Sequence, residues 1–177
     1  RRPEVHRSAH AVADLLSQAG FGDVRIVSEG GAPAVIARHP APPGAPTVLL
    51  YAHHDVQPEG DESQWVSPPF APTERDGRLY GRGSADDKAG IATHLAAFRA
   101  HGGQPPVGVT VFVEGEEESG SPSLGALLAA HRGALAADVI VIADSDNWSA
   151  ETPSLTVSLR GLVDCVVEVA TLDHGLH

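Results

Sequence analysis

The chain has 177 residues, of which 42% are hydrophobic, so it is long enough to form a domain with a buried core. Its formal net charge is -11 and Lys88 is its one lysine, so it lacks the basic surface that binds a nucleic acid backbone. It has no stretch of about 18 apolar residues to span a membrane and no apolar signal segment at its start, so we expect a cytoplasmic protein without a membrane partner.

The first half of the sequence is expected to contain one helix and three strands. Apolar residues recur at helical spacing over residues 4–19. Residues 24–28 and 34–38 are predicted strands separated by a glycine-containing break, and a stiff proline-rich link leads to a buried strand over residues 47–53. Residues 58–83 are rich in proline, glycine and charge, so we expect a long ordered loop without a regular element.

The second half alternates helices and strands up to residue 142. Helical spacing predicts helices over residues 87–100 and 124–131, and apolar β-branched runs predict strands over 107–113 and 138–142. Such alternation is typical of helices packed on a mostly parallel sheet. We therefore expect an α/β domain with a mixed, mostly parallel sheet.

The last part of the sequence has a different pattern. Residues 155–159 and 163–170 are strand-like runs, broken at Arg160-Gly161. Because helices no longer alternate with these strands, we expect a second domain to begin there. The expected division is residues 1–160 and residues 161–177.

Histidine and carboxylate side chains gather in four clusters along the chain. These are His53-His54-Asp55, Asp86-Asp87-Lys88, Glu116-Glu117-Glu118 and Asp144-Ser145-Asp146. Three of the clusters follow apolar strands, and the carboxyl ends of strands in an open α/β sheet form the crevice where ligands bind. Separate segments can therefore converge on one site, and together the clusters predict a hydrolase with two metal ions.

The first two clusters each allow a metal-binding and a structural interpretation. Residues two apart in a strand point to the same side, so Asp55 can touch His53, as the supporting carboxylate of a metal-binding histidine does. A histidine that is merely hydrogen-bonded at a strand end is the alternative, and His54, which points the other way, is expected to be structural. Asp86 and Asp87 follow a glycine-containing loop, and capping of the next helix is the alternative to metal binding for each, more so for Asp87.

The other two clusters also have two interpretations. Three adjacent glutamates after an apolar strand are costly unless a positive charge lies nearby, and a divalent cation is the obvious candidate. In hydrolytic metal sites one carboxylate binds metal while another takes a proton from water. An exposed acidic turn ahead of a helix is the alternative. Asp144 and Asp146 are both candidate ligands, and a turn-forming aspartate is the alternative for each.

Four ordered motifs make the sequence resemble the di-zinc exopeptidase and amidohydrolase family of carnosine dipeptidase, carboxypeptidase G, aminoacylase and succinyl-diaminopimelate desuccinylase. The motifs occupy residues 52–58 (AHHDVQP), 81–88 (GRGSADDK), 114–121 (EGEEESGS) and 145–147 (SDN). The resemblance implies a three-layer catalytic domain, the beginning of an α+β lid and dimerisation domain, and two divalent metal ions. Histidine and carboxylate ligands suit zinc, and manganese or cobalt could occupy the same site.

The resemblance also implies roles for individual residues. The implied metal ligands are His53, Asp86, Glu118 and Asp146. Asp86 would bridge both ions, and Glu117 would be the general base for the metal-bridging water that attacks the peptide carbonyl. Asp55 would hold a metal-binding histidine in place. The peptide bond between Asp86 and Asp87 is expected to be cis.

Within this family the sequence resembles the dipeptidase branch. Residues 65–70 (WVSPPF) and 145–147 resemble that branch, whereas deacylases typically have glutamate at the position of Asp146. We therefore expect hydrolysis of dipeptides or short peptides. The alternatives are an N-acyl amino acid deacylase and a metal-binding domain without turnover.

The sequence departs from the family in length. Full-length members are more than twice as long, form dimers, and carry a last histidine ligand near their C-terminus. We therefore interpret the chain as an N-terminal portion of the catalytic domain with the first lid strand, and expect it to be incomplete by itself and the full-length protein to be a homodimer. His177 resembles the lid histidine that binds substrate, and His174 competes for that assignment.

Overall fold

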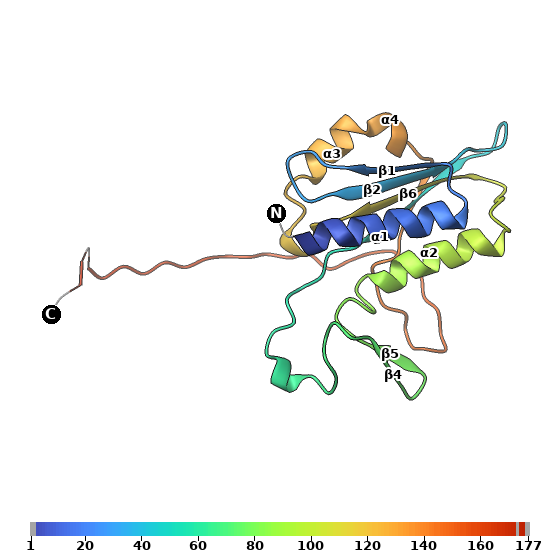
Figure 1. Cartoon of the computed structure of the whole chain (residues 1–177). Helices are drawn as coiled ribbons and strands as arrows, with labels where there is room; N and C mark the ends of the chain where they lie inside the picture. Colours follow the sequence, from blue (N-terminus) through green and yellow to red (C-terminus); the bar gives the residue numbers. More distant parts are fainter. Residues whose placement is uncertain (1–2, 173, 176–177) are drawn as a thin grey trace. The chain divides into compact units, whose positions relative to one another are not determined.

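The computed structural model describes residues 3–172 and 174–175. The chain divides into two compact units, Arg1–Asp144 and Ser145–His177. Every helix and strand of the described residues lies in the first unit (Figure 1). Among those residues, no helix combines the length and the apolar character that crossing a bilayer requires.

A mixed five-stranded sheet forms the centre of the first unit. Its strands are β1 (Asp23–Val27), β2 (Ala34–His39), β3 (Thr47–His53), β6 (Gly108–Glu114) and β7 (Val139–Ile142). The strand order is β1-β2-β6-β3-β7; β1, β2 and β6 pair antiparallel, and β3 pairs parallel with both β6 and β7. The expected α/β fold with a mixed sheet is therefore confirmed.

Helices pack on both faces of the sheet, which gives the expected three layers. Helices α1 (Pro3–Ala19) and α2 (Lys88–Ala100) lie along one face (Figure 1). Leu16 of α1 and Ile91 of α2 are buried there among apolar strand residues. Helices α3 (Leu124–Ala130) and α4 (Arg132–Leu135) cover the other face, where Leu127 and Leu135 pack against the sheet. Burial of these apolar stripes is the main force that holds the layers together.

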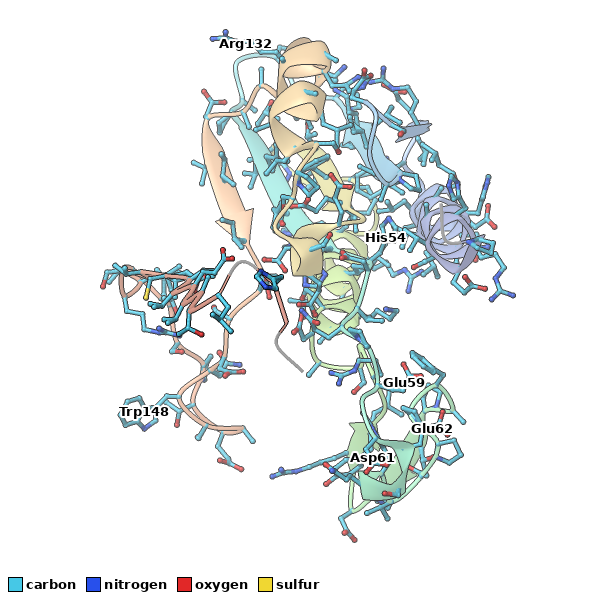
Figure 2. All side chains as sticks on the ribbon, turned by 90° about the vertical axis from the view of Figure 1, so that its left-hand side faces the viewer. His54, Glu59, Asp61, Glu62, Arg132 and Trp148 are labelled. Atoms are coloured by element: carbon cyan, nitrogen blue, oxygen red, sulfur yellow. The ribbon has the colours of Figure 1, made fainter. Side chains whose placement is uncertain are left out.

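Residues 58–83 contain regular structure, so the expectation of a loop without it is wrong. A short 3₁₀ turn, η1 (Glu62–Gln64), is followed by a two-stranded hairpin of β4 (Thr73–Arg75) and β5 (Arg78–Tyr80). The two residues between the strands, Asp76 and Gly77, have φ of 51° and 71°, as a tight hairpin turn requires. The Asp-Gly pair was the sequence signal for this hairpin. Figure 2 labels three acidic residues of this segment, Glu59, Asp61 and Glu62.

The second unit has no strand among its described residues, which corrects the prediction for residues 155–159 and 163–170. Apolar side chains of both runs are exposed, for example Val157 and Val163. A β-strand is stable only when its backbone groups pair with a neighbouring strand, and no such neighbour is present in the described part of this unit. The lid domain expected from residue 161 onward stays a prediction.

Gly115, which follows β6, is held so closely that a larger residue cannot replace it without a shift. A Cβ atom there would lie 2.4 Å from the carbonyl oxygen of Pro33 and 2.8 Å from the buried His54 ring. We expect Gly115→Ala to lower the free energy of unfolding by about 1 to 3 kcal/mol, which urea denaturation would measure. Gly125→Ala is the control, because Gly125 lies in α3 with no atom within 4 Å of its Cβ position. The free energy of unfolding of the control is expected to rise by up to about 1 kcal/mol. An equal decrease in both variants would contradict the expected effect of the close packing around Gly115.

Candidate metal centre

Three parallel strands bring polar segments to the same edge of the sheet. β3 ends at His53, β6 ends at Glu114, and β7 ends two residues before Asp144. His53 and Glu114 are paired in the sheet register, and Tyr51 is paired with Ile142. Because parallel strands end at the same edge, the segments that follow them lie close together there.

The imidazole of His53 is the centre of a cluster of three ligand-type side chains. His53 Nε2 lies 2.8 Å from Asp86 Oδ1 and 3.9 Å from Asp144 Oδ2. One ligand atom from each residue lies within 4.8 Å of the other two. An imidazole nitrogen and carboxylate oxygens at this spacing are a suitable donor set for a divalent cation such as zinc.

The second ring nitrogen of His53 faces Asp55. His53 Nδ1 lies 3.4 Å from Asp55 Oδ1 and 3.2 Å from the Asp55 carbonyl oxygen, so Nε2 is left toward the cluster. Burial lowers the pKa of the imidazole, but the hydrogen bond with Asp55 and the surrounding negative charges outweigh burial and raise it to about 9. The contact between the two side chains is the one that the strand spacing predicts.

Asp55 also holds the segment that follows β6. Its Oδ1 accepts a hydrogen bond from the backbone N–H of Glu117 at 3.2 Å, and its Oδ2 accepts one from Glu118 at 3.1 Å. Burial raises the pKa of Asp55, but its hydrogen bonds with His53 and the Glu118 backbone outweigh burial and hold the pKa below its usual value. A single carboxylate therefore fixes both the histidine and the short 3₁₀ turn η2 (Glu117–Ser119).

The two adjacent aspartates before α2 point to different partners. The peptide bond between Asp86 and Asp87 is cis, as the resemblance implies. Asp86 is directed to His53, and its side chain is 60% exposed, so its carboxylate is open to a second partner. Asp87 is buried, and it accepts hydrogen bonds from the backbone N–H groups of His53 and Gly90, both at 3.1 Å. Asp87 thus caps α2, as its position predicts, and anchors the end of β3.

The carboxyl of Glu117 is electrostatically linked to His53 and Asp144 of the cluster. Burial raises its pKa above the usual value, the positive charge of His53 opposes the rise, and the charge of Asp144 adds to it. Among the described residues, no hydrogen bond to the Glu117 carboxylate is found, so its oxygens are not held by another protein group. A carboxylate with a raised pKa beside a metal-type donor set is suited to accept a proton.

The side chain of Glu118 is held by hydrogen bonds from Gln57. The backbone N–H of Gln57 donates to Glu118 Oε1 at 3.2 Å, and Gln57 Nε2 donates to Glu118 Oε2 at 2.8 Å. Gln57 Nε2 also donates to the Glu118 carbonyl oxygen at 3.0 Å. Gln57 lies within the motif at residues 52–58 but was not among the predicted site residues.

Two expected site residues are not tested by the structure. Asp146 belongs to the second unit, so its assignment as a metal ligand stays a prediction. His177 lies outside the described residues, so its assignment to substrate binding also stays a prediction. Asp144, which the sequence left as an alternative ligand, lies beside His53.

Comparison with known proteins places the chain in a family. Residues 49–174 match peptidase family M20/M25/M40. The cysteinylglycine-S-conjugate dipeptidase of Corynebacterium striatum is 42% identical over 136 residues, which cover 75% of this chain and 30% of that protein. The beta-Ala-His dipeptidase of Rattus norvegicus is 38% identical over 150 residues, which cover 82% of this chain and 30% of that protein.

A solved structure gives the same result. Human carnosine dipeptidase 1 superimposes with a TM-score of 0.73 and 34% identity, over 83% of this chain and 34% of that one. The chain thus spans about a third of the length of the relatives that it matches. The chain belongs to peptidase family M20/M25/M40, and within that family it resembles the branch of carnosine and cysteinylglycine dipeptidases.

Proposed function

We propose that this protein hydrolyses dipeptides or other short peptides with the help of two bound metal ions. The observation that carries the proposal is the cluster of His53, Asp86 and Asp144 in a chain whose relatives include dipeptidases. The carboxyl of Glu117 interacts electrostatically with His53 and Asp144 of that cluster. The arrangement combines a cation site with a group that can move a proton, which is what peptide hydrolysis requires.

The donor atoms suggest how two ions would be shared. His53, Asp86 and Asp144 would hold one ion, with Asp146 as the further ligand that the resemblance implies. The exposed carboxylate of Asp86, together with Glu118, would hold the other. When bound, the ions would polarise the scissile carbonyl and lower the pKa of the attacking water to about 7. Zinc suits these ligands, and manganese or cobalt would also fit.

The protein's own groups would position the ligands and move the proton. Glu117 would accept a proton from the attacking water and then donate it to the leaving amine. Its pKa, raised by burial, brings it nearer to neutral pH, where transfer in both directions is most effective. Asp55 would keep His53 Nε2 directed at the cation, and Asp87 would keep the backbone of His53 in place.

The proposal is tested by turnover with defined substrates. The protein is loaded with zinc, manganese or cobalt, and the release of free amino acid from dipeptides is compared with release from N-acetyl amino acids. We expect metal-dependent release from dipeptides that EDTA abolishes. Faster release from N-acetyl amino acids would favour a deacylase, and bound metal without any turnover in the full-length protein would favour a metal-binding domain.

Metal binding is expected to depend strongly on pH because of His53. The imidazole must be neutral to bind a cation, whereas a pKa of about 9 keeps it protonated at neutral pH. The apparent affinity should therefore rise about tenfold for each pH unit up to about pH 9 and then level off, with about one proton released per His53 ligation. Calorimetry in buffers of different ionisation enthalpy measures that proton.

Asp55→Asn is the matched variant for this pH dependence. It removes the charge and weakens the hydrogen bond that together raise the pKa of His53. The pH at which the affinity levels off should then move to a lower value. An affinity that does not change between about pH 7 and 9 in the unmodified protein would contradict the assigned state of His53.

A further inference from the structure

We propose that Glu116 is a positioning residue whose carboxylate fixes the turn that carries Glu117 and Glu118, and that it neither binds metal nor transfers a proton. This inference rests on the proposed function, because it concerns the placement of the proposed general base and of a proposed ligand. Three adjacent glutamates would then have three different tasks. The contacts of the Glu116 side chain are the basis for separating it from its two neighbours.

Both carboxylate oxygens of Glu116 are already occupied by donors of the protein. Oε1 accepts a hydrogen bond from the backbone N–H of Ser123 at 2.6 Å and another from the Ser123 hydroxyl. Oε2 accepts a hydrogen bond from the backbone N–H of Ala32 at 2.9 Å. The residue is 8% exposed. A carboxylate with such partners is satisfied where it lies and is not directed to a cation.

The loop between β1 and β2 packs closely on the Glu116 carboxylate. A Cβ atom on Gly31 would lie 2.5 Å from Glu116 Oε2 and 2.2 Å from Ser123 Oγ. Only glycine therefore fits at this point without a shift, and the backbone of the loop between β1 and β2 packs directly on the carboxylate. The Glu116 carboxylate is therefore covered by this loop.

These contacts connect the β1–β2 loop and the start of α3 to the turn η2, which carries Glu117 and Glu118. Ala32 belongs to the loop between β1 and β2, and Ser123 is the residue just before α3. The Glu116 carbonyl oxygen accepts from the backbone N–H groups of Ser119 at 3.2 Å and Ser121 at 3.0 Å, which closes the turn. Glu116 thereby anchors η2 at its start, while Asp55 holds the N–H groups of Glu117 and Glu118.

Loss of one acceptor oxygen should loosen the turn. In Glu116→Gln one oxygen becomes an NH₂ group, which is a donor and faces another donor in either orientation of the amide. A buried N–H, that of Ala32 or Ser123, then has no acceptor. Because a buried unsatisfied donor is costly, the turn should open more often, and the carboxyl groups of Glu117 and Glu118 should be less well placed.

Amide hydrogen exchange tests the inference on the metal-free protein. In Glu116→Gln we expect the amides of Glu117 and Glu118 to exchange about 10- to 100-fold faster, while Val111 in the middle of β6 is unchanged. Glu74→Gln, the same chemical change at an exposed position on β4, is the control and should alter neither. Unchanged exchange at Glu117 and Glu118 in the first variant overturns the inference.

Cobalt binding tests the functional consequence. We expect Glu116→Gln to weaken Co²⁺ binding about 10- to 100-fold and to change the visible absorption spectrum, which reports coordination geometry. Ser123→Ala removes one donor to the same carboxylate without changing charge, so it should show a smaller effect in the same direction. Weaker Co²⁺ binding in Glu116→Gln, without a change in the absorption spectrum or in the amide exchange of Glu117 and Glu118, would be an effect of the lost charge. That result would overturn the inference.

The two proposals can fail separately. If the unmodified protein does not bind Co²⁺, Zn²⁺ or Mn²⁺, the proposed function fails, whereas amide exchange still decides whether Glu116 anchors the turn. If the unmodified protein binds metal and hydrolyses dipeptides, but Glu116→Gln matches it in exchange, spectrum and turnover, the positioning role alone is wrong.

Discussion

Glu117→Gln is expected to lower kcat for dipeptide hydrolysis by about 100- to 10,000-fold, the usual contribution of a general base. Glutamine has nearly the same shape but cannot accept a proton from water or return it to the leaving amine. The backbone N–H of Glu117, which donates to Asp55, is unaffected by the change, so the turn should keep its place. The effect should therefore be confined to proton transfer.

The measurement is steady-state turnover together with elemental analysis of bound metal. Bound metal should equal that of the unmodified protein, because His53, Asp86 and Asp144 are intact. Glu74→Gln on β4 again serves as the control for the same chemical change. Turnover within about threefold of the unmodified protein would remove Glu117 from its proposed role, because a general base contributes far more than that.

Asp86→Ala is expected to release bound metal. The Asp86 carboxylate lies 2.8 Å from His53 Nε2 and its side chain is 60% exposed, so we propose that it contacts both ions. Loss of a group that only supports a ligand typically weakens metal binding about 10- to 100-fold. Loss of the Asp86 carboxylate should weaken metal binding by more than that. Hydrolysis should disappear with the metal.

Elemental analysis after dialysis distinguishes the outcomes. Close to two metal equivalents in the unmodified protein, absent in Asp86→Ala, would show an assembled site with a bridging aspartate. One equivalent would indicate a site limited to the cluster around His53. Asp14→Ala, at an exposed position on α1, is the control and should retain all of its metal. Full retention by Asp86→Ala as well would rule out Asp86 as a ligand.

Elements with a strong local signal were predictable from the sequence. Helices α1 and α2 and strand β3 follow from apolar periodicity, because that periodicity determines which face of an element can be buried. The hairpin of β4 and β5 also had a local signal, the Asp76-Gly77 turn, but the proline and glycine content of the surrounding residues suggested a loop. The strands expected over 155–159 and 163–170 have suitable composition, but strand pairing depends on a neighbour that composition does not supply.

The motifs in the sequence determined the family and the residue types of the proposed site, because ligand and acid-base chemistry depends on the side chains themselves. Only the tertiary structure distinguished the roles of neighbouring residues with the same side chain. It directs Glu116 to Ala32 and Ser123, and it leaves Glu117 beside the cluster. It likewise places Asp144 next to His53 and turns Asp87 to the backbone. The physical reason is that a carboxylate's role depends on its partners, and these partners come from strands and loops that are distant in sequence and meet only in the folded sheet.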